Sequence, residues 1–219
     1  WILDPTTKGR YRLATTSGIF LAAHHQLSAW VNQPEQQWQL KAGSDGYSQL
    51  FNAADQTALT PANCKAEDNS LCQDWLLLPT GKTVLSSRQS GKVLSTADCA
   101  SQDGTLITQQ SWSQQQCQQW NWKVGQAGFL QLQNSQNPEL CVQVKQDALA
   151  AGADLVLGSC SAKSSQWALQ LLTNGAVSLF SAHTKQAVDL PGCSLFDAVA
   201  LKQAPAAADA ICQQFQLRN

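Results

Sequence analysis

The sequence of 219 residues contains no methionine, only three histidines and few charged residues, which make up 13% of the chain. Its formal net charge is -1 and it has no run of lysine or arginine, so we do not expect it to bind nucleic acid. The longest apolar stretches, such as 75–78 and 204–208, are far shorter than the roughly 20 residues of a membrane-spanning helix. Membrane insertion is therefore not expected either.

The sequence patterns of common enzyme classes are also missing. There is no Gly-x-Ser-x-Gly, no phosphate-binding glycine loop and no His-Glu-x-x-His, and acidic residues are scattered singly. The histidines are His24, His25 and His183, and the adjacent pair fits a solvated loop better than a metal or pH-sensitive site. We therefore predict a protein without catalytic residues, metal ligands or cofactors.

Several absences concern the origin of the chain. It begins at Trp1 without a charged and then apolar leader, and because methionine is absent we expect it to be processed or excised from something longer. No Asn-x-Ser/Thr acceptor occurs, which slightly favours a bacterial over an animal or plant secretory origin. The eight cysteines, an even number, are typical of a disulfide framework formed in an oxidising compartment. We predict a secreted protein.

A repeated Gln-x-Trp pattern, with near variants, is the main positive signal. Each unit closes with an aromatic residue, and a leucine follows 10 or 12 positions after each closing aromatic but the last. The first of these intervals starts at Trp1. Trp1 therefore resembles the end of an earlier unit. The five closing aromatic residues are spaced by 37, 45, 47 and 48 positions, a period that indicates a repeat architecture. They are Trp38, Trp75, Trp120, Trp167 and Phe215, and the leucines are Leu13, Leu50, Leu85, Leu132 and Leu179.

Between these positions the sequence shows strand and turn chemistry. Short alternating apolar runs such as 82–85 and 129–132 are bounded by Gly, Ser, Asn and Asp. No segment keeps a helical period over the length of a typical helix, and the alanine-rich stretch 204–210 is interrupted by Pro205. The chain is predicted to be almost entirely β.

The cysteines fall in pairs inside these units. The members of successive pairs are 8, 18, 19 and 19 positions apart, and bridges of this loop size each stabilise a small unit by a few kcal/mol. The predicted disulfides are Cys64–Cys72, Cys99–Cys117, Cys141–Cys160 and Cys193–Cys212.

The sequence resembles the ricin-B-like lectin family, whose units carry the Gln-x-Trp signature. The resemblance is most specific at 90–94, 103–107 and 117–120 and in the spacing of Cys141 and Cys160. It implies an all-β, ricin B-type β-trefoil in which the signature aromatics are buried. We expect one complete trefoil at 79–219, whose three units have equal length and equal disulfides, and a partial second trefoil at 1–78. In another phasing the first three units close together.

The family also implies where a galactose-like sugar would be held. Its members use an Asp after a strand near the start of the unit, an aromatic about fifteen residues on, and polar groups at or just before Gln-x-Trp. Asp189 with Gln213 is the best candidate, although the aromatic position falls near Lys202 and Gln203, and Phe196 would serve only if its loop folds back. Alternatively, Asp189 caps the turn before Pro191. The five Asp positions are Ala22, Thr60, Ser95, Gln143 and Asp189.

Other candidate contacts lie near the signature. Trp30 and Trp112 each precede their signature tryptophan by eight residues in a polar loop, where an aromatic is often a contact residue. Alternatively, either one replaces a bridging sulfur and packs on its own unit. Gln118 is an intact family position, as are Gln36 and Gln73, but such glutamines are as much structural as ligand-facing.

The predicted function is a carbohydrate-binding region for galactose-type sugars. It would target a larger secreted bacterial protein, a toxin or hydrolase, to glycans or glycoproteins, and would contact other domains or subunits of that protein. The alternative is a degenerate trefoil that serves as a structural or protein–protein interaction module without sugar binding.

Overall fold

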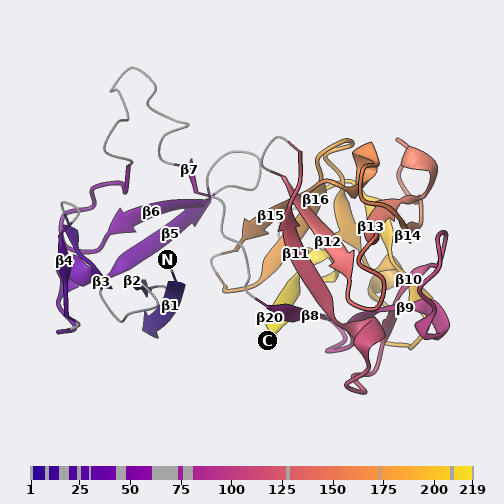
Figure 1. The fold of residues 1–219 in the computed structure, drawn as a ribbon, viewed down its shortest axis with the longest axis horizontal. Helices are drawn as coiled ribbons and strands as arrows, with labels where there is room; N and C mark the ends of the chain where they lie inside the picture. Colours follow the sequence, from indigo (N-terminus) through magenta and orange to yellow (C-terminus); the bar gives the residue numbers. More distant parts are fainter. Residues whose placement is uncertain are drawn as a thin grey trace. The chain divides into compact units, whose positions relative to one another are not determined.

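The computed structural model divides into two compact units, Trp1–Leu77 and Leu78–Asn219, shown in Figure 1. The described residues form strands and single 3-10 turns and no α-helix, as the sequence predicts. Nowhere among them is there a helix of the length and hydropathy needed to cross a membrane. The described residues are 2–7, 10–14, 20–23, 26–29, 31–42, 48–60, 74–75, 81–126, 129–172, 174–207 and 210–218.

The described residues of the N-terminal unit form one sheet with a small apolar core. Its strands follow the order β4-β3-β2-β5-β6-β7, and β1 pairs with β2. Trp38 packs with leucines at 13, 21, 50 and 59, and its indole Nε1 donates a hydrogen bond to the Leu21 carbonyl at 3.1 Å. The elements are β1 Ile2–Thr7, β2 Arg10–Ala14, β3 Phe20–Leu21, β4 Leu27–Ser28, η2 Pro34–Gln36, β5 Trp38–Ala42, β6 Ser48–Asn52 and β7 Asp74–Trp75.

The C-terminal unit consists of three repeats of one pattern, which we call repeat 1 (81–126), repeat 2 (129–172) and repeat 3 (174–218). In repeat 1 the elements are β8 Lys82–Ser87, β9 Val93–Thr96, η5 Ala97–Cys99, β10 Ile107–Gln110, η6 Gln116–Gln118 and β11 Trp120–Val124. In repeat 2 they are β12 Leu130–Asn134, β13 Leu140–Val144, η8 Lys145–Asp147, β14 Leu155–Ser159, η9 Lys163–Ser165 and β15 Trp167–Leu171. In repeat 3 they are β16 Val177–Ser181, β17 Ala187–Asp189, η10 Pro191–Cys193, β18 Val199–Ala200, β19 Lys202–Ala204, η11 Ile211–Gln213 and β20 Phe215–Arg218.

The first and last strands of the three repeats close into a barrel. Pairing runs β8-β11-β12-β15-β16-β20 and returns to β8, so these six strands leave no open edge. The inner strands of each repeat form a hairpin, as β9 does with β10, β13 with β14 and β17 with β19. A six-stranded barrel with three hairpins is a β-trefoil, and the predicted fold class is confirmed.

Equivalent large side chains of the three repeats fill the core. Trp120, Trp167 and Phe215 are 0% exposed, and leucines 85, 132 and 179 are buried with them. The indole Nε1 of Trp120 donates to the Leu94 carbonyl at 3.2 Å, and that of Trp167 to Val142 at 2.9 Å. A phenylalanine at the third position has no N–H group that needs a partner. The prediction that these residues anchor the core is confirmed, whereas the side chains of Trp1 and Trp75 lie outside the described part.

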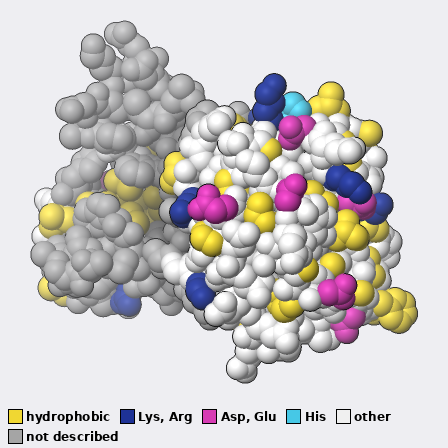
Figure 2. Space-filling model, turned by 45° about the vertical axis from the view of Figure 1, so that its right-hand side comes forward, with side chains coloured by type: hydrophobic (Ala, Val, Ile, Leu, Met, Phe, Trp, Pro, Cys, Tyr) yellow, Lys and Arg dark blue, Asp and Glu magenta, His cyan; other side chains and the backbone are white. Residues whose placement is uncertain are grey.

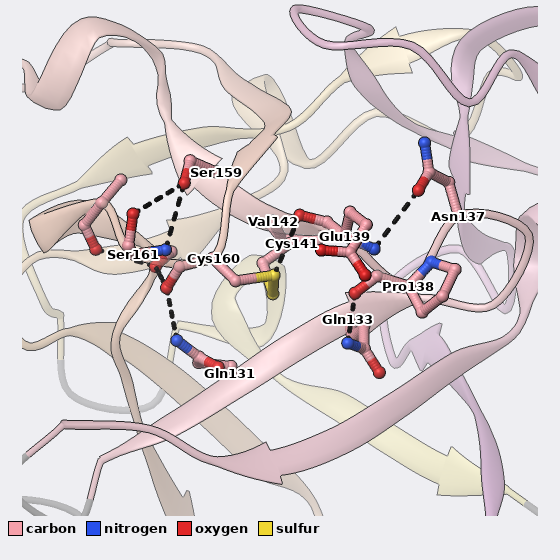
Figure 3. Close-up of a disulfide and its surroundings, with 12 residues drawn as sticks. Gln131, Gln133, Asn137, Pro138, Glu139, Cys141, Val142, Ser159, Cys160 and Ser161 are labelled. Atoms are coloured by element: carbon pink, nitrogen blue, oxygen red, sulfur yellow. Dashed lines mark hydrogen bonds between the residues drawn. A yellow bond between two sulfur atoms is a disulfide. The ribbon is translucent and has the colours of Figure 1, made fainter.

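Three of the four predicted disulfides are present, but they are not equivalent. Cys99–Cys117 and Cys193–Cys212 each join the turn after the second strand to the turn before the signature, with Cα atoms 5.1 Å apart. Cys141–Cys160 instead links β13 to the end of β14, with Cα atoms 4.9 Å apart (Figure 3). The expectation of equal disulfides is therefore wrong. Cys64 and Cys72 lie outside the described residues.

Candidate functional site

The best candidate from the sequence, Asp189 with Gln213, is assembled in repeat 3. Asp189 ends β17 and Gln213 ends η11, and the Leu190 amide donates to the Cys212 carbonyl at 3.0 Å, which ties the two elements together. Gln213 Nε2 donates to Asp189 Oδ1 at 3.1 Å. Gln213 is buried and Asp189 is half-buried. Asp189 Oδ2 has no hydrogen-bond partner in the described part of the chain, so it can accept hydrogen bonds from a ligand.

Asp189 does not cap the turn that follows it. The 3-10 turn η10 has no side-chain cap, and the oxygen of Asp189 that is bonded receives its hydrogen from Gln213. The turn is held instead by the Cys193–Cys212 bridge. Because Cys212 directly precedes Gln213, the bridge also lies next to the candidate site.

No aromatic face covers Asp189 from the expected positions. Lys202 lies opposite Asp189 in the register of β17 and β19, but its ammonium is 3.2 Å from Asp154 Oδ1. Gln203 is buried and its amide is bonded to repeat 2. The backbone carbonyl of Phe196 accepts a hydrogen bond from Gln109 of repeat 1, so its loop is held against that repeat. The candidate site thus has a carboxylate and an amide without a stacking face from these residues.

The corresponding positions of the other two repeats are closed. Ser95 is buried, and its hydroxyl donates to the Thr96 carbonyl at 3.0 Å. In repeat 2 the family's aromatic position, fifteen residues after Gln143, is Gly158. The side-chain amide of Gln143 occupies the space that a Cβ on Gly158 would take. The Oε1 atom of Gln143 is buried without a partner in the described part. Repeat 2 therefore fills its own site with its own side chain.

The signature glutamines share a structural role that the sequence leaves open. Gln118 Oε1 accepts from the Ser113 amide at 2.8 Å, and its Nε2 donates to the Ser111 carbonyl at 2.8 Å, so one side chain closes the loop before it. Gln36 and Gln213 close their own loops with the same pair of bonds, to Val31 and Ala29 and to Ala207 and Pro205. Gln213 differs from them because its amide also holds a carboxylate. Gln73 lies outside the described residues.

Trp112 is open to solvent. Its side chain is 43% exposed, and the bridge of its repeat is made by Cys99 and Cys117, so Trp112 is not a buried substitute for a sulfur. Trp30 lies outside the described residues, as do His24 and His25.

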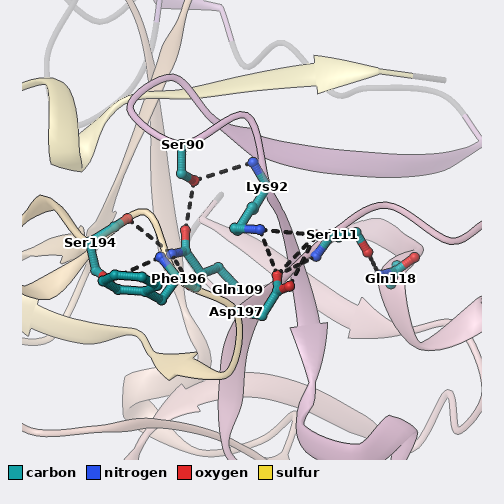
Figure 4. A network of polar contacts seen from close by, with 8 residues as sticks. All are labelled: Ser90, Lys92, Gln109, Ser111, Gln118, Ser194, Phe196 and Asp197. Atoms are coloured by element: carbon teal, nitrogen blue, oxygen red, sulfur yellow. Dashed lines mark hydrogen bonds and ion pairs between the residues drawn. The ribbon is translucent and has the colours of Figure 1, made fainter.

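Sequence reasoning missed a polar network between repeats 1 and 3 (Figure 4). Lys92 Nζ lies 2.8 Å from Asp197 Oδ1, and the amide and hydroxyl of Ser111 donate to the same carboxylate. These contacts lower the pKa of the Asp197 carboxyl, and the hydrogen bond from Lys92 has the largest effect. Ser111 and Asp197 are 86 positions apart, so no local pattern could indicate their pairing.

The family model described as ricin-type β-trefoil lectin domain-like matches residues 71–158 and 116–204. The chain belongs to this family. The resemblance seen in the sequence is therefore confirmed. No curated protein sequence matches the chain.

Solved structures with the same fold include a designed and two natural proteins. ThreeFoil, a designed threefold symmetric protein, has 26% identity and a TM-score of 0.61, over 64% of this chain and 99% of its own. An exo-β-1,3-galactanase from Clostridium thermocellum has 18% identity and a TM-score of 0.59, over 98% of this chain and 56% of its own. The Macrolepiota procera ricin B-like lectin, in complex with lactose, has 15% identity and a TM-score of 0.55, over 66% of this chain and 99% of its own. The chain thus spans little more than half of the galactanase.

Proposed function

We propose that the chain is a non-catalytic carbohydrate-binding region that holds a galactose-type sugar at Asp189 and Gln213. The observation that carries the proposal is the hydrogen bond from Gln213 Nε2 to Asp189 Oδ1, because it orients the one carboxylate found at a family sugar position. The lactose complex of the Macrolepiota procera lectin, which shares the fold, supports the ligand class.

The division of labour between the two residues follows from their hydrogen bonds. Both N–H groups of the Gln213 amide are used, one on Asp189 and one on the Pro205 carbonyl, so Gln213 positions the carboxylate. Asp189 then accepts hydrogen bonds from neighbouring sugar hydroxyls through Oδ2, and such charge-assisted bonds are the strong ones. Gln118 is buried and serves its loop in the same way, so in this proposal it supports the fold of repeat 1. Trp30 stays a predicted sugar contact.

We further propose that the region delivers a larger secreted bacterial protein, a toxin or a hydrolase, to glycans or glycoproteins. The exo-β-1,3-galactanase, a hydrolase, matches this chain over only 56% of its own length. Three disulfides are typical of proteins that fold in an oxidising compartment, which supports secretion. Figure 2 shows the charged side chains on the visible face of the C-terminal unit in small groups, several of which contain both signs, so that face offers no basic patch to a polyanion. In this proposal residues 1–78 form a partial trefoil, and residues 79–219 form a complete one.

A degenerate trefoil that serves only as a structural or interaction module is the second candidate. The observation that favours it is the closure of the family position in repeats 1 and 2, where Ser95 is buried and Gln143 fills the site.

A glycan array with the full chain separates the two functions. We expect binding to galactose-terminated glycans, at least a tenfold loss in Asp189→Ala, and unchanged binding in Asp103→Ala, which removes an exposed carboxylate of repeat 1. Thermal unfolding of all three proteins checks that the variants fold. If the wild type binds no glycan class at millimolar sensitivity, the interaction module is the better description.

A further inference from the structure

The threefold repetition provides three equivalent junctions that can be compared with one another. At the junction of repeats 1 and 3, Gln109 Nε2 donates to the carbonyls of Ser194 at 3.0 Å and Phe196 at 2.6 Å, which clamps the loop after η10 onto β10. Gln203 of repeat 3 clamps the loop of repeat 2 in the same way, through the carbonyls of Ala148 and Ala150 at 2.8 and 2.7 Å. These shared bonds fix which residues of the repeats correspond.

Aromatic side chains occupy both sides of only one junction. Phe196 is 78% exposed and its neighbour Leu195 is 58% exposed, while Trp112, three positions after the clamping Gln109, faces solvent from repeat 1. At the junction of repeats 2 and 3 the residues that correspond to Phe196 and Trp112 are Ala150 and Ala206. At the junction of repeats 1 and 2 they are Gln102 and Cys160. The fold therefore does not require aromatics at these positions.

The loop that carries Phe196 is firmly held although its aromatic side chain is not packed. Ser111 N donates to Asp197 Oδ1 at 2.7 Å and Lys92 Nζ lies 2.8 Å from the same atom (Figure 4). Ala198 has a φ of +60° where the other repeats have Gly104 and Gly152, so the loop keeps its path despite an unfavourable backbone angle. A rigid loop that presents an exposed aromatic lowers the entropy cost of binding a ligand.

Each of the two aromatics is next in sequence to a residue of the polar network, Trp112 to Ser111 and Phe196 to Asp197. In Figure 4, Phe196 lies to one side of Asp197, and Ser111, which precedes Trp112, lies to the other. Because successive Cα atoms are 3.8 Å apart and Ser111 bonds Asp197, the Cα atoms of Trp112 and Phe196 are separated by roughly 15 Å or less. The side chain of Asp197 is 47% exposed and remains open to further hydrogen bonds.

We infer that this junction, made of Trp112, Phe196, Asp197, Lys92 and Ser111, is a second carbohydrate-binding surface that takes an extended oligosaccharide. Aromatic faces stack on the C–H faces of sugar rings, and the carboxylate and ammonium of the same surface bind ring hydroxyls. A protein partner would need an interface of about 800 Å² on each side, whereas the apolar part of this surface consists of two side chains, Trp112 and Phe196. The surface lies on the clamped loop and β10, apart from the Asp189 position, and shares only the ligand class with the proposed function.

Calorimetric titration of the full chain with galactose, lactose and β-1,3-linked galactotriose tests the inference. Trp112→Ala and Phe196→Ala should each weaken galactotriose binding about tenfold, as expected for the loss of one stacked ring, and change galactose binding little. Leu149→Ala is the matched control, because Leu149 is a large apolar residue that is also exposed, on the clamped loop of repeat 2. In the wild-type chain, galactotriose should also shift the indole N–H resonance of Trp112.

The outcomes separate the two binding surfaces. If Asp189→Ala abolishes binding of all three sugars and neither aromatic variant changes it, the junction surface is wrong and the Asp189 site stands. If the aromatic variants weaken galactotriose binding and Asp189→Ala does not, the inference stands and the Asp189 site is wrong. A change from dimer to monomer on Phe196→Ala in sedimentation would identify a second copy as the occupant and overturn the inference, as would a Trp112 resonance that galactotriose leaves unmoved.

Discussion

Repeats 2 and 3 hold the same two turns together by different chemistry. In repeat 3 the turn after the second strand is joined to the turn before the signature by Cys193–Cys212. At the same two positions repeat 2 has Asp147 and Ser164, and the Ser164 amide donates to Asp147 Oδ1 at 3.1 Å. Its own disulfide, Cys141–Cys160, lies elsewhere, where Gln131 donates to the Cys160 carbonyl (Figure 3). A covalent link in one repeat is thus matched by a hydrogen bond in the other.

The backbone is the same in both cases, which shows that the bridge does not determine the path of the chain. Asp147 has a φ of +51° and Cys193 a φ of +50°, and each follows another residue with positive φ. The packing of the hairpins therefore imposes this turn, and the link across it only adds stability. The difference lies in what each link responds to, since a disulfide is sensitive to reduction and a carboxylate to pH.

The largest expected effect comes from removing the bridge of repeat 3. Cys193→Ser with Cys212→Ser should lower the free energy of unfolding by about 3 kcal/mol, because the bridge closes a loop of 19 positions. It should also weaken any galactose binding, since Cys212 directly precedes Gln213. Cys99→Ser with Cys117→Ser is the control. Its denaturant unfolding should show a similar loss of stability, and calorimetry should show an unchanged affinity for galactose. Equal sugar affinity in both double variants would show that the bridge does not support the site.

The converse exchange should stabilise repeat 2. Asp147→Cys with Ser164→Cys places a bridge where the other two repeats have one, and we expect a gain of about 2 kcal/mol, below the full loop-closure value because engineered bridges often strain the native state. Mass spectrometry after proteolysis reports whether the new pair forms beside Cys141–Cys160, and unfolding with and without reductant gives its contribution. A bridge that forms but does not stabilise would mean that the turns of repeat 2 are less alike than their dihedral angles indicate.

The sequence predicts the barrel better than the disulfides and the polar contacts between repeats. Aromatics such as Trp120 and Trp167 recur at a fixed period because every repeat must bury one large side chain at the same barrel position, and that requirement is visible in a single chain. Two cysteine pairs have the same spacing of 19, but Cys212 directly precedes the signature of its repeat, whereas Cys160 lies five positions before Ser165. Counting cysteine positions from the signature would have shown that the two disulfides are not equivalent. The link between Ser111 and Asp197 follows from closure of the trefoil, which leaves no local trace.

A smaller effect should distinguish the closed site of repeat 2 from the open one of repeat 3. Gly158→Ala should cost about 1 kcal/mol, because the new Cβ displaces the Gln143 amide from its place over Gly158. In a Gln143→Ala background the same substitution should be neutral, so a double-mutant cycle of unfolding free energies should give a coupling of about the same size. Ala204→Gly in repeat 3, fifteen positions after Asp189, is the control and should show no coupling to Asp189→Ala. Additive costs in repeat 2 would mean that Gln143 does not fill the site.

The smallest effect concerns the pH response of the two links. Hydrogen bonds from Ser164, and to a lesser degree the charges of His183 and Lys163, lower the pKa of Asp147. A carboxyl whose pKa is lower in the folded state stabilises the fold above its unfolded pKa of about 4, and this contribution is lost as the pH falls through the folded value. Because Asp147 is exposed, solvent screening should keep it below about 1 kcal/mol. Asp147→Asn should therefore reduce stability at pH 7 but not at pH 2. Denaturant unfolding at the two pH values measures this, with Asp103→Asn as the control. An equal loss at both pH values would mean that the contact of Asp147 with Ser164 does not depend on its charge.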